Sequence, residues 1–312
     1  MNPAANRMIY TVSGINIDSA ISLAGIFPLS AESQVDAVIR LVTTDDELAD
    51  GLPLGVSYDQ NRKELIATHP SVGSFSMVGG KEIRVRAKAG VPEAELANVL
   101  VTTPLAALLL QRGLVTLHAS AIETDRGAIV FLGPTTTGKS CLAACFQQKG
   151  CTVLTDDLTV LSKDTNGSVW VMSGDGRLKL ARGAARKWKD ATREFATLRR
   201  RVRKRVLPAM GPSVAKKTLL SKIYLLETSG EEVALRGIDE KKRGQILGNN
   251  TYQAELLTRM GLWQTYRKCL INNLSTAPIS VISIPRGFKQ IELAGEQIAL
   301  DIKPVAQPAA QP

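Results

Sequence analysis

Gly133-Pro-Thr-Thr-Thr-Gly-Lys-Ser140 is the most informative stretch of this 312-residue chain. It fits the pattern G-x-x-x-x-G-K-[ST], in which the backbone turns tightly at glycines so that several N–H groups converge on phosphate oxygens. The apolar run 128–132 precedes it and predicts a strand buried on both faces. A helix is expected from Lys139 to Lys149, with Gly150 just past its end. The N-terminus of that helix would favour an anion, so the pattern predicts a phosphate-binding loop.

The residue types of this phosphate loop (133–140) favour a nucleoside triphosphate. Lys139 would reach the terminal phosphates, and the Ser140 hydroxyl would bind Mg²⁺. We therefore assign nucleotide binding to the loop and the residue after it: Gly133, Pro134, Thr135, Thr136, Thr137, Gly138, Lys139, Ser140 and Cys141. The alternative is a Gly/Thr turn carrying a solvated lysine.

Thr136 stands where many such loops have glycine. A β-branched residue is costly at positive φ. Either this position is not left-handed in this chain, or the loop geometry is altered.

Two carboxylates follow the next predicted strand. The segment 151–155 reads as a strand that Asp156 and Asp157 end, which places both acids at the mouth of the phosphate site. One carboxylate can hold Mg²⁺, and the other can take a proton from an attacking hydroxyl. The alternative is a turn with two solvated acids.

His118 lies inside a predicted strand, 114–122, that precedes the strand of the phosphate loop. A single histidine on a strand is often a core residue with its hydrogen bonds satisfied. Close to two carboxylates it could instead orient one of them or tune its pKa. The sequence leaves both interpretations open.

The first third of the chain carries no such motif and predicts a β-rich subdomain over 1–110. Short alternating runs separated by turn residues indicate strands in a half-buried antiparallel sheet. These runs are 8–13, 35–42, 65–67, 74–78 and 82–86. A helix is expected to begin near Pro92 and to continue or restart through Gln111.

The remainder, 111–303, is predicted to form the nucleotide-binding core, followed by an unstructured tail, 304–312. Strands alternating with helices place the chain in the α/β class with a mixed sheet. Beyond the phosphate loop we expect strands at 168–172, 223–226 and 279–284, and helices at 182–205 and 250–273.

The net charge of +10 comes from one segment. Residues 182–222 hold 14 Lys and Arg against 2 acids, a net charge of +12, so the rest of the chain is slightly acidic. The segment could dock an acidic substrate, contact the backbone of a nucleic acid through 199–205, or form a solvated helix face. Trp188 and Phe195 are the aromatic residues nearby, which is few for base stacking. We therefore favour an acidic partner over nucleic acid.

The sequence predicts a cytoplasmic protein. Its four cysteines and two histidines show no zinc-ligand spacing, so buried, reduced thiols are expected. The N-terminus lacks the apolar core of a secretory signal. The longest apolar run, 99–110, is shorter than the roughly 20 residues of a membrane span.

Three stretches together resemble a known family: 111–121 around His118, 131–140 around the phosphate loop, and 150–158 around the two aspartates. They are similar to the catalytic domain of bacterial HPr kinase/phosphorylase, and more closely to single-domain HPr-kinase-like serine kinases, which include kinases of peptide precursors. The close match covers about 105–165. The Glu-Ile-Arg-Gly-Leu-Gly signature of the true HPr enzyme has no match in this chain.

The resemblance implies an ATP-dependent kinase that phosphorylates a serine in a protein or peptide. The implied fold is the P-loop mixed-sheet type shared with phosphoenolpyruvate carboxykinase. Lys139 and Ser140 would bind phosphate and Mg²⁺, Asp156 would assist the metal, and Asp157 would be the general base with His118 beside it. Two alternatives stay open: an ATP-binding module for nucleic acid, and a non-catalytic nucleotide sensor. No membrane partner is expected, and a homo-oligomer stays open.

Overall fold

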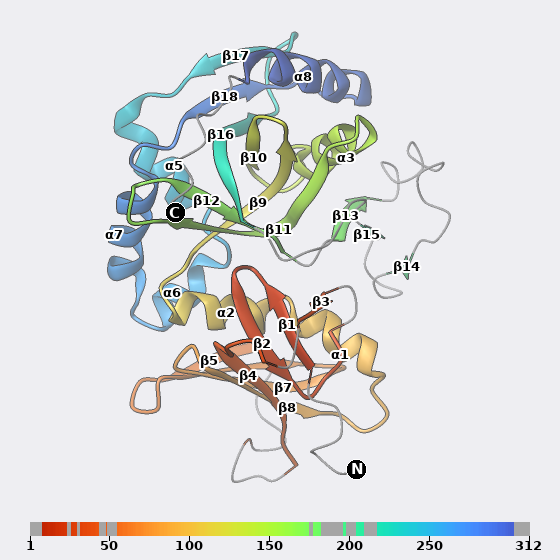
Figure 1. The fold of residues 1–312 in the computed structure, drawn as a ribbon, viewed down its shortest axis with the longest axis vertical. Coiled ribbons are helices and arrows are strands. Elements are labelled where there is room, and N and C mark those ends of the chain that lie inside the picture. Colours follow the sequence, from red (N-terminus) through yellow and green to blue (C-terminus); the bar gives the residue numbers. More distant parts are fainter. Residues whose placement is uncertain are drawn as a thin grey trace. The chain divides into compact units, whose positions relative to one another are not determined.

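The computed structural model shows a mixed α/β architecture of packed sheets and helices (Figure 1). It describes residues 8–23, 26–29, 32–43, 48, 55–174, 177–181, 196–197, 204–208 and 217–302. The chain divides into two compact units. Unit 1 consists of Met1–Thr116, Ser213–Lys216 and Thr251–Asn272, and unit 2 of Leu117–Pro212, Lys217–Asn250 and Asn273–Pro312. The sequence prediction had placed 251–272 with the C-terminal core.

Unit 1 is built on an eight-stranded sheet in the order β3-β1-β2-β4-β8-β7-β6-β5. Its strands are β1 Met8–Val12, β2 Ile15–Ser19, β3 Phe27–Pro28, β4 Ala37–Leu41, β5 Gly55–Asp59, β6 Glu64–His69, β7 Gly73–Val78 and β8 Glu82–Ala87. The five alternating runs in the sequence fall on β1, β4, β6, β7 and β8.

The prediction of a purely antiparallel sheet was wrong. β4 pairs in parallel with both β2 and β8, whereas β5 to β8 form an antiparallel meander. The meander folds back so that its last strand, rather than its first, lies next to β4. Local turn residues set the antiparallel pairs, but this longer connection brings β8 beside β4 in the same direction.

Two consecutive helices, α1 Glu93–Leu100 and α2 Thr103–Gln111, follow the sheet. Glu93 and Glu95 lie in the first turn of α1, where acids complement the helix dipole. Together the two helices are, within the described residues, the one stretch long and apolar enough to cross a membrane. The core helix of a folded unit meets the same criteria, and every α2 residue from Pro104 to Leu110 is buried in the protein.

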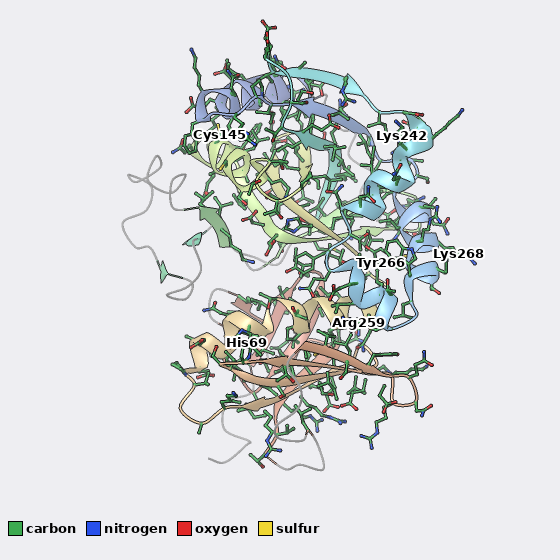
Figure 2. The ribbon with its side chains drawn as sticks, turned by 180° about the vertical axis from the view of Figure 1, so that it is seen from behind. His69, Cys145, Lys242, Arg259, Tyr266 and Lys268 are labelled. Carbon is green, nitrogen blue, oxygen red and sulfur yellow. The ribbon has the colours of Figure 1, made fainter. Side chains whose placement is uncertain are left out.

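The single helix predicted at 250–273 is two helices, α6 Ala254–Arg259 and α7 Trp263–Leu274. Gly261, at φ 69°, sits in the break between them. The Tyr266 hydroxyl on α7 (Figure 2) donates to the Thr116 carbonyl at 2.8 Å and accepts from the Thr116 N–H at 3.1 Å. Arg259 on α6 donates to the carbonyl of Val56 on the edge strand β5 at 3.2 Å. These bonds explain why this late segment belongs to unit 1.

Unit 2 is built on a seven-stranded sheet in the order β10-β9-β11-β12-β16-β18-β17. β10 also pairs with β16, so the pairings β10–β9–β11–β12–β16 form a closed circuit. The strands are β9 Val115–Thr124, β10 Gly127–Leu132, β11 Thr152–Lys163, β12 Val169–Met172, β16 Lys217–Glu227, β17 Ala234–Gly237 and β18 Ile279–Ser283. β10, β16 and β18 run parallel to one another, so their carboxyl ends lie at one edge.

The prediction of a helix at 182–205 was wrong where the structure describes that segment. Three short strands, β13 Arg177–Ala181, β14 Ala196–Thr197 and β15 Lys204–Pro208, form a small antiparallel sheet. Leu178 and Leu180 alternate along β13 and are fully buried. Pairing of β14 and β15 with one another and of β15 with the buried strand β13 overrides the helical preference of a segment rich in Arg, Ala and Leu. The rest of 182–216 and the predicted tail 304–312 lie outside the described residues.

The helical elements of unit 2 are α3 Lys139–Gln148, the 3-10 helix η2 Glu240–Lys242, α5 Arg243–Asn249 and α8 Phe288–Asp301. α3 and α8 share a core with the sheet through Phe131, Leu142, Phe146, Ala294 and Ile298. Phe131 and Phe146 stack with ring centroids 5.9 Å apart, which joins β10 to α3 directly. The sequence analysis did not predict α5 or α8.

Two glycines that begin strands of unit 1 allow a test of its packing. A Cβ on Gly73 would lie 2.1 Å from the Arg86 carbonyl oxygen, whereas one on Gly55 would meet nothing within 4 Å. Both glycines have positive φ, so alanine is strained at either position. We expect Gly55→Ala to lower the free energy of unfolding by about 1–2 kcal/mol and Gly73→Ala by about 3–5 kcal/mol, because strain and overlap add.

Urea unfolding followed by circular dichroism measures both values. Equal losses for the two variants would contradict the close approach of β7 to β8 at Gly73.

Candidate active site

The phosphate loop follows the buried strand β10 and opens α3, as its pattern predicts. Gly133 has φ 138° and Gly138, the N-cap of α3, has φ 100°. A Cβ on Gly133 would lie 2.7 Å from the Leu226 carbonyl oxygen, and one on Gly138 would lie 2.6 Å from Ile291 Cδ1. Both positions therefore need glycine for backbone conformation, and Gly133 also needs it for space because the atom it meets belongs to the backbone.

Thr136 occupies the left-handed region at φ 75°. The alternative that this position is not left-handed is therefore wrong: Thr136 adopts the backbone conformation that glycine has in other loops of this pattern, and the chain accepts the strain. A left-handed L-residue costs roughly 1–2 kcal/mol. Its neighbours Thr135 and Thr137 are not left-handed.

Lys139 is buried, with 7% of its surface exposed. Its ammonium donates to the carbonyl oxygens of Gly133 at 2.6 Å and Pro134 at 3.1 Å, so the side chain follows the inside of the loop. Asn250, at the end of α5, anchors the start of the loop because its Oδ1 accepts from the Gly133 N–H at 2.9 Å. The Asn250 carbonyl also accepts from the His118 N–H at 2.7 Å. One residue thus ties the loop to the strand that carries His118.

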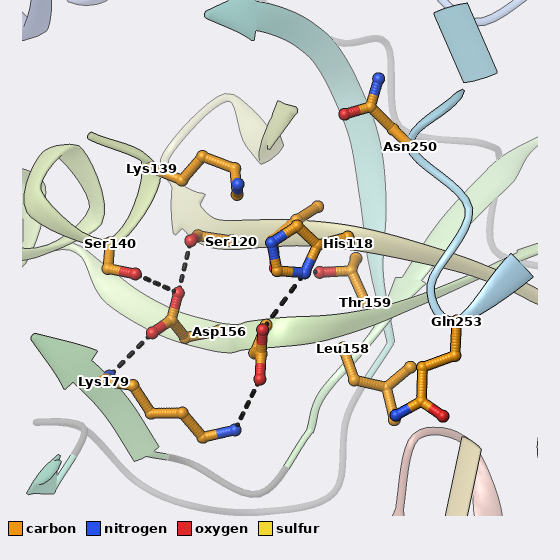
Figure 3. A network of polar contacts seen from close by, with 12 residues as sticks. His118, Ser120, Lys139, Ser140, Asp156, Leu158, Thr159, Lys179, Asn250 and Gln253 are labelled. Atoms are coloured by element: carbon orange, nitrogen blue, oxygen red, sulfur yellow. Dashed lines mark hydrogen bonds and ion pairs between the residues drawn. The ribbon is translucent and has the colours of Figure 1, made fainter. Parts of the chain in front are cut away.

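The carboxylate of Asp156 is 3% exposed and collects three donors (Figure 3). Its Oδ1 accepts from Ser140 at 2.9 Å and from Ser120 at 2.5 Å, and its Oδ2 accepts from the Lys179 N–H at 2.7 Å. Burial raises the pKa of Asp156, and the three hydrogen bonds oppose that rise.

The sequence predicted that Asp156 and Asp157 end a strand. That prediction was wrong, because β11 runs through both aspartates from Thr152 to Lys163. Successive strand residues ordinarily point to opposite faces. Asp157 has φ 86°, and this left-handed residue interrupts the alternation. Both carboxylates accordingly take part in one polar network (Figure 3).

Two basic side chains hold Asp157. His118 Nδ1 lies 3.2 Å from its Oδ1, and Lys179 Nζ lies 3.1 Å from its Oδ2. Burial alone would raise the pKa of Asp157, but the hydrogen bonds from His118 and Lys179 and the charge of Lys179 outweigh it and hold the pKa well below its usual range. His118 therefore pairs with a carboxylate, which decides between the two interpretations of this residue.

Cys141 lies in the first turn of α3 and packs beside the core of unit 2. Burial and the nearby Asp156 raise the pKa of its thiol to about 11, so it stays protonated at neutral pH. All four cysteines are free thiols, but only Cys145 is buried; the other three are partly exposed. In the part of the chain that the structure describes, no group of three or more His, Cys, Asp or Glu side chains is arranged as a metal site.

The structure brings together every residue assigned to chemistry from the sequence and adds three that were missed: Ser120, Lys179 and Asn250. Ser120 was within reach of prediction, because residues two apart on a strand share a face and His118 was already suspected. Lys179 lies in Leu178-Lys-Leu180, which alternates as a strand does. Nothing in the sequence shows that this strand lies beside the aspartates of β11. Asn250 lies 117 residues from Gly133 and had no local signal.

Comparison with known proteins does not show the family to which this chain belongs. No protein-family model matches the sequence, and no curated protein matches it. Among solved structures, the Hpr(Ser) kinase/phosphatase from Coxiella burnetii is similar over 59% of this chain and 96% of that protein, with 12% sequence identity and a TM-score of 0.31. A likeness at this score does not establish a shared fold.

The strain at Thr136 can be measured with a neighbouring control. Thr136→Gly should raise the free energy of unfolding by up to about 1 kcal/mol, because glycine removes the left-handed penalty but adds backbone entropy to the unfolded chain. Thr135→Gly adds the same entropy without relieving strain and should lower stability by about 0.5–1 kcal/mol.

Both threonines are exposed, so packing changes little in either variant. Thermal unfolding by calorimetry should shift the two melting temperatures in opposite directions. A decrease in both would contradict the left-handed conformation of Thr136.

Proposed function

We propose that this protein is an ATP-dependent kinase that transfers the γ-phosphoryl group to a serine of a protein or peptide. The observation that carries the proposal is the hydrogen bond between Ser140 of the phosphate loop and Asp156, next to a second carboxylate held by His118 and Lys179. A loop for phosphate, oxygen ligands for a metal and an ionised carboxylate are the parts that phosphoryl transfer requires.

Lys139 would bind the β- and γ-phosphates. Its ammonium now bonds two carbonyls of its own loop, and phosphate oxygens are stronger acceptors for a charged donor. The backbone N–H groups of the loop and of the start of α3 would bind the remaining phosphate oxygens. In this arrangement the chain's contribution is positioning and charge stabilisation.

Ser140 and Asp156 would hold Mg²⁺. A hydroxyl and a carboxylate 2.9 Å apart suit this ion, which is usually bound by one or two protein oxygens together with substrate phosphates. An ion held there would supply positive charge to neutralise the charge that develops during transfer. The buried position of Asp156 and its bonds to Ser120 and Lys179 keep the carboxylate directed at Ser140.

Asp157 would accept the hydrogen bond of the substrate serine hydroxyl and take its proton as the new O–P bond forms. Because its pKa is well below the usual range, Asp157 is ionised at neutral pH, and the proton moves late in the reaction. His118 and Lys179 hold the carboxylate in place. Serine as the acceptor, and a protein or peptide as its carrier, come from the resemblance of the motifs to HPr-kinase-like enzymes.

The partner and the location remain predictions from the sequence. The basic segment 182–222 would dock an acidic substrate, and the protein would act in the cytoplasm. Most of this segment lies outside the described residues.

The experiment follows transfer of ³²P from γ-labelled ATP to proteins of a cell lysate and to a serine peptide library, with purified protein and Mg²⁺. The wild type should label serine, identified by mass spectrometry. Asp157→Asn and Lys139→Met should each lower labelling by at least 100-fold, as loss of a general base or of phosphate binding does.

Matched controls are Asp125→Asn and Lys149→Met, the same substitutions at exposed positions of unit 2. Both should keep wild-type labelling. Wild-type protein that binds ATP but labels no acceptor would overturn the kinase proposal and favour the nucleotide sensor.

A further inference from the structure

The segment after β18 lies at the same edge of the unit 2 sheet as the phosphate loop. β10, β16 and β18 are parallel neighbours, with Leu132 paired to Leu225 and Leu225 to Val281. β10 continues into the loop, and β18 continues through Ile284 toward α8. The β18–α8 connection therefore begins at the edge of the sheet from which the loop 133–140 emerges.

α8 packs along α3 in the same direction, starting at the phosphate loop. Ile291 of α8 lies against Gly138, where a Cβ would come within 2.6 Å of its Cδ1. One turn further on, the position of Gly295 faces Leu142, Cys145 and Phe146 of α3. Positions nearer the start of α8 therefore lie beside positions nearer the start of α3, and the first residues of α8 come closest to the loop (Figure 1 shows both helices).

Phe288 is the next position on this face. It precedes Ile291 by three residues and Gly295 by seven, so all three share one side of α8. It lies about 4.5 Å beyond Ile291 along the helix axis, at the level of the phosphate loop rather than of α3. Unlike Ile291, which is buried, Phe288 is 41% exposed.

An exposed ring next to a phosphate site suits the base of a nucleotide. Stacking of a base on an aromatic side chain is worth 1–3 kcal/mol and needs no hydrogen-bond pattern. The exposed Arg286, two residues earlier, adds a cation that can stack on a base or contact phosphate. Among the described residues, the loop and the side chains hydrogen-bonded to it include no Phe, Tyr or Trp that could stack on a base.

We propose that Phe288 forms the platform on which the purine base of ATP stacks while the triphosphate lies on 133–140. This inference rests on the proposed nucleotide binding and adds the subsite that distinguishes a nucleotide from a bare triphosphate. Phe288 contributes to affinity through the base alone.

The test compares ATP with inorganic tripolyphosphate, each titrated with Mg²⁺ into the full chain by isothermal calorimetry. Phe288→Ala should weaken ATP binding about tenfold, within the 5- to 150-fold range of one stacking contact. It should leave tripolyphosphate affinity within twofold of the wild type. Phe288→Trp keeps a ring and should restore ATP affinity, whereas Leu300→Ala, at an 88% exposed position of the same helix, should change neither ligand.

Unchanged ATP affinity in Phe288→Ala would overturn the inference and leave the proposed function intact. An equal loss for ATP and tripolyphosphate would also overturn it, because that result means a distorted loop rather than a lost base contact. Wild-type protein that binds neither ligand would overturn the phosphate site itself, and with it both proposals.

Discussion

The buried carboxylate of Asp156 joins the separate parts of the candidate site. It lies on β11 and accepts from α3 through Ser140, from β9 through Ser120 and from β13 through the Lys179 N–H. Removing a carboxylate from water costs several kcal/mol unless it is hydrogen-bonded. Three donors meet that requirement, and each comes from a different element. The helix that follows the loop 133–140, two strands of the large sheet and the small sheet are therefore held in one arrangement by a single carboxyl group.

The adjacent Asp157 shows how one strand can supply two carboxylates with different properties. Its left-handed φ interrupts the alternation of β11, and it meets His118 and Lys179 rather than the hydroxyls around Asp156. Burial dominates at Asp156 and raises its pKa, while basic partners dominate at Asp157 and lower its pKa. Environments that move two neighbouring pKa values apart are typical of sites in which the two groups have separate roles. A solvated turn, the alternative from sequence, would give neither shift.

Local patterns in the sequence were sufficient to predict those parts of the candidate site that neighbouring residues form together. The loop follows a buried strand and opens a helix. An apolar run, two glycines and a series of helix-forming residues stand in that order within 128–150, and this order predicts that arrangement. Residues that reach the site from a distant part of the sequence had no such pattern. Lys179 reaches the aspartates only because β13 lies against β11, and Asn250 reaches Gly133 only through the fold of α5. The helix expected at 182–205 failed for the same reason, since pairing between β13, β14 and β15 is not visible in composition.

The unfavourable features of unit 2 gather at this site rather than in its core. The core between β10, α3 and α8 is made of fully buried aliphatic and aromatic side chains, with Phe131 and Phe146 stacked at its centre. Thr136 accepts a left-handed backbone where glycine would relax it, and Asp156 is a buried carboxyl group that needs three hydrogen-bond donors. Stability alone would favour glycine at position 136. Strain and a buried carboxyl group beside the loop 133–140 are what the proposed function would require, and the well-packed core is what allows the fold to tolerate them.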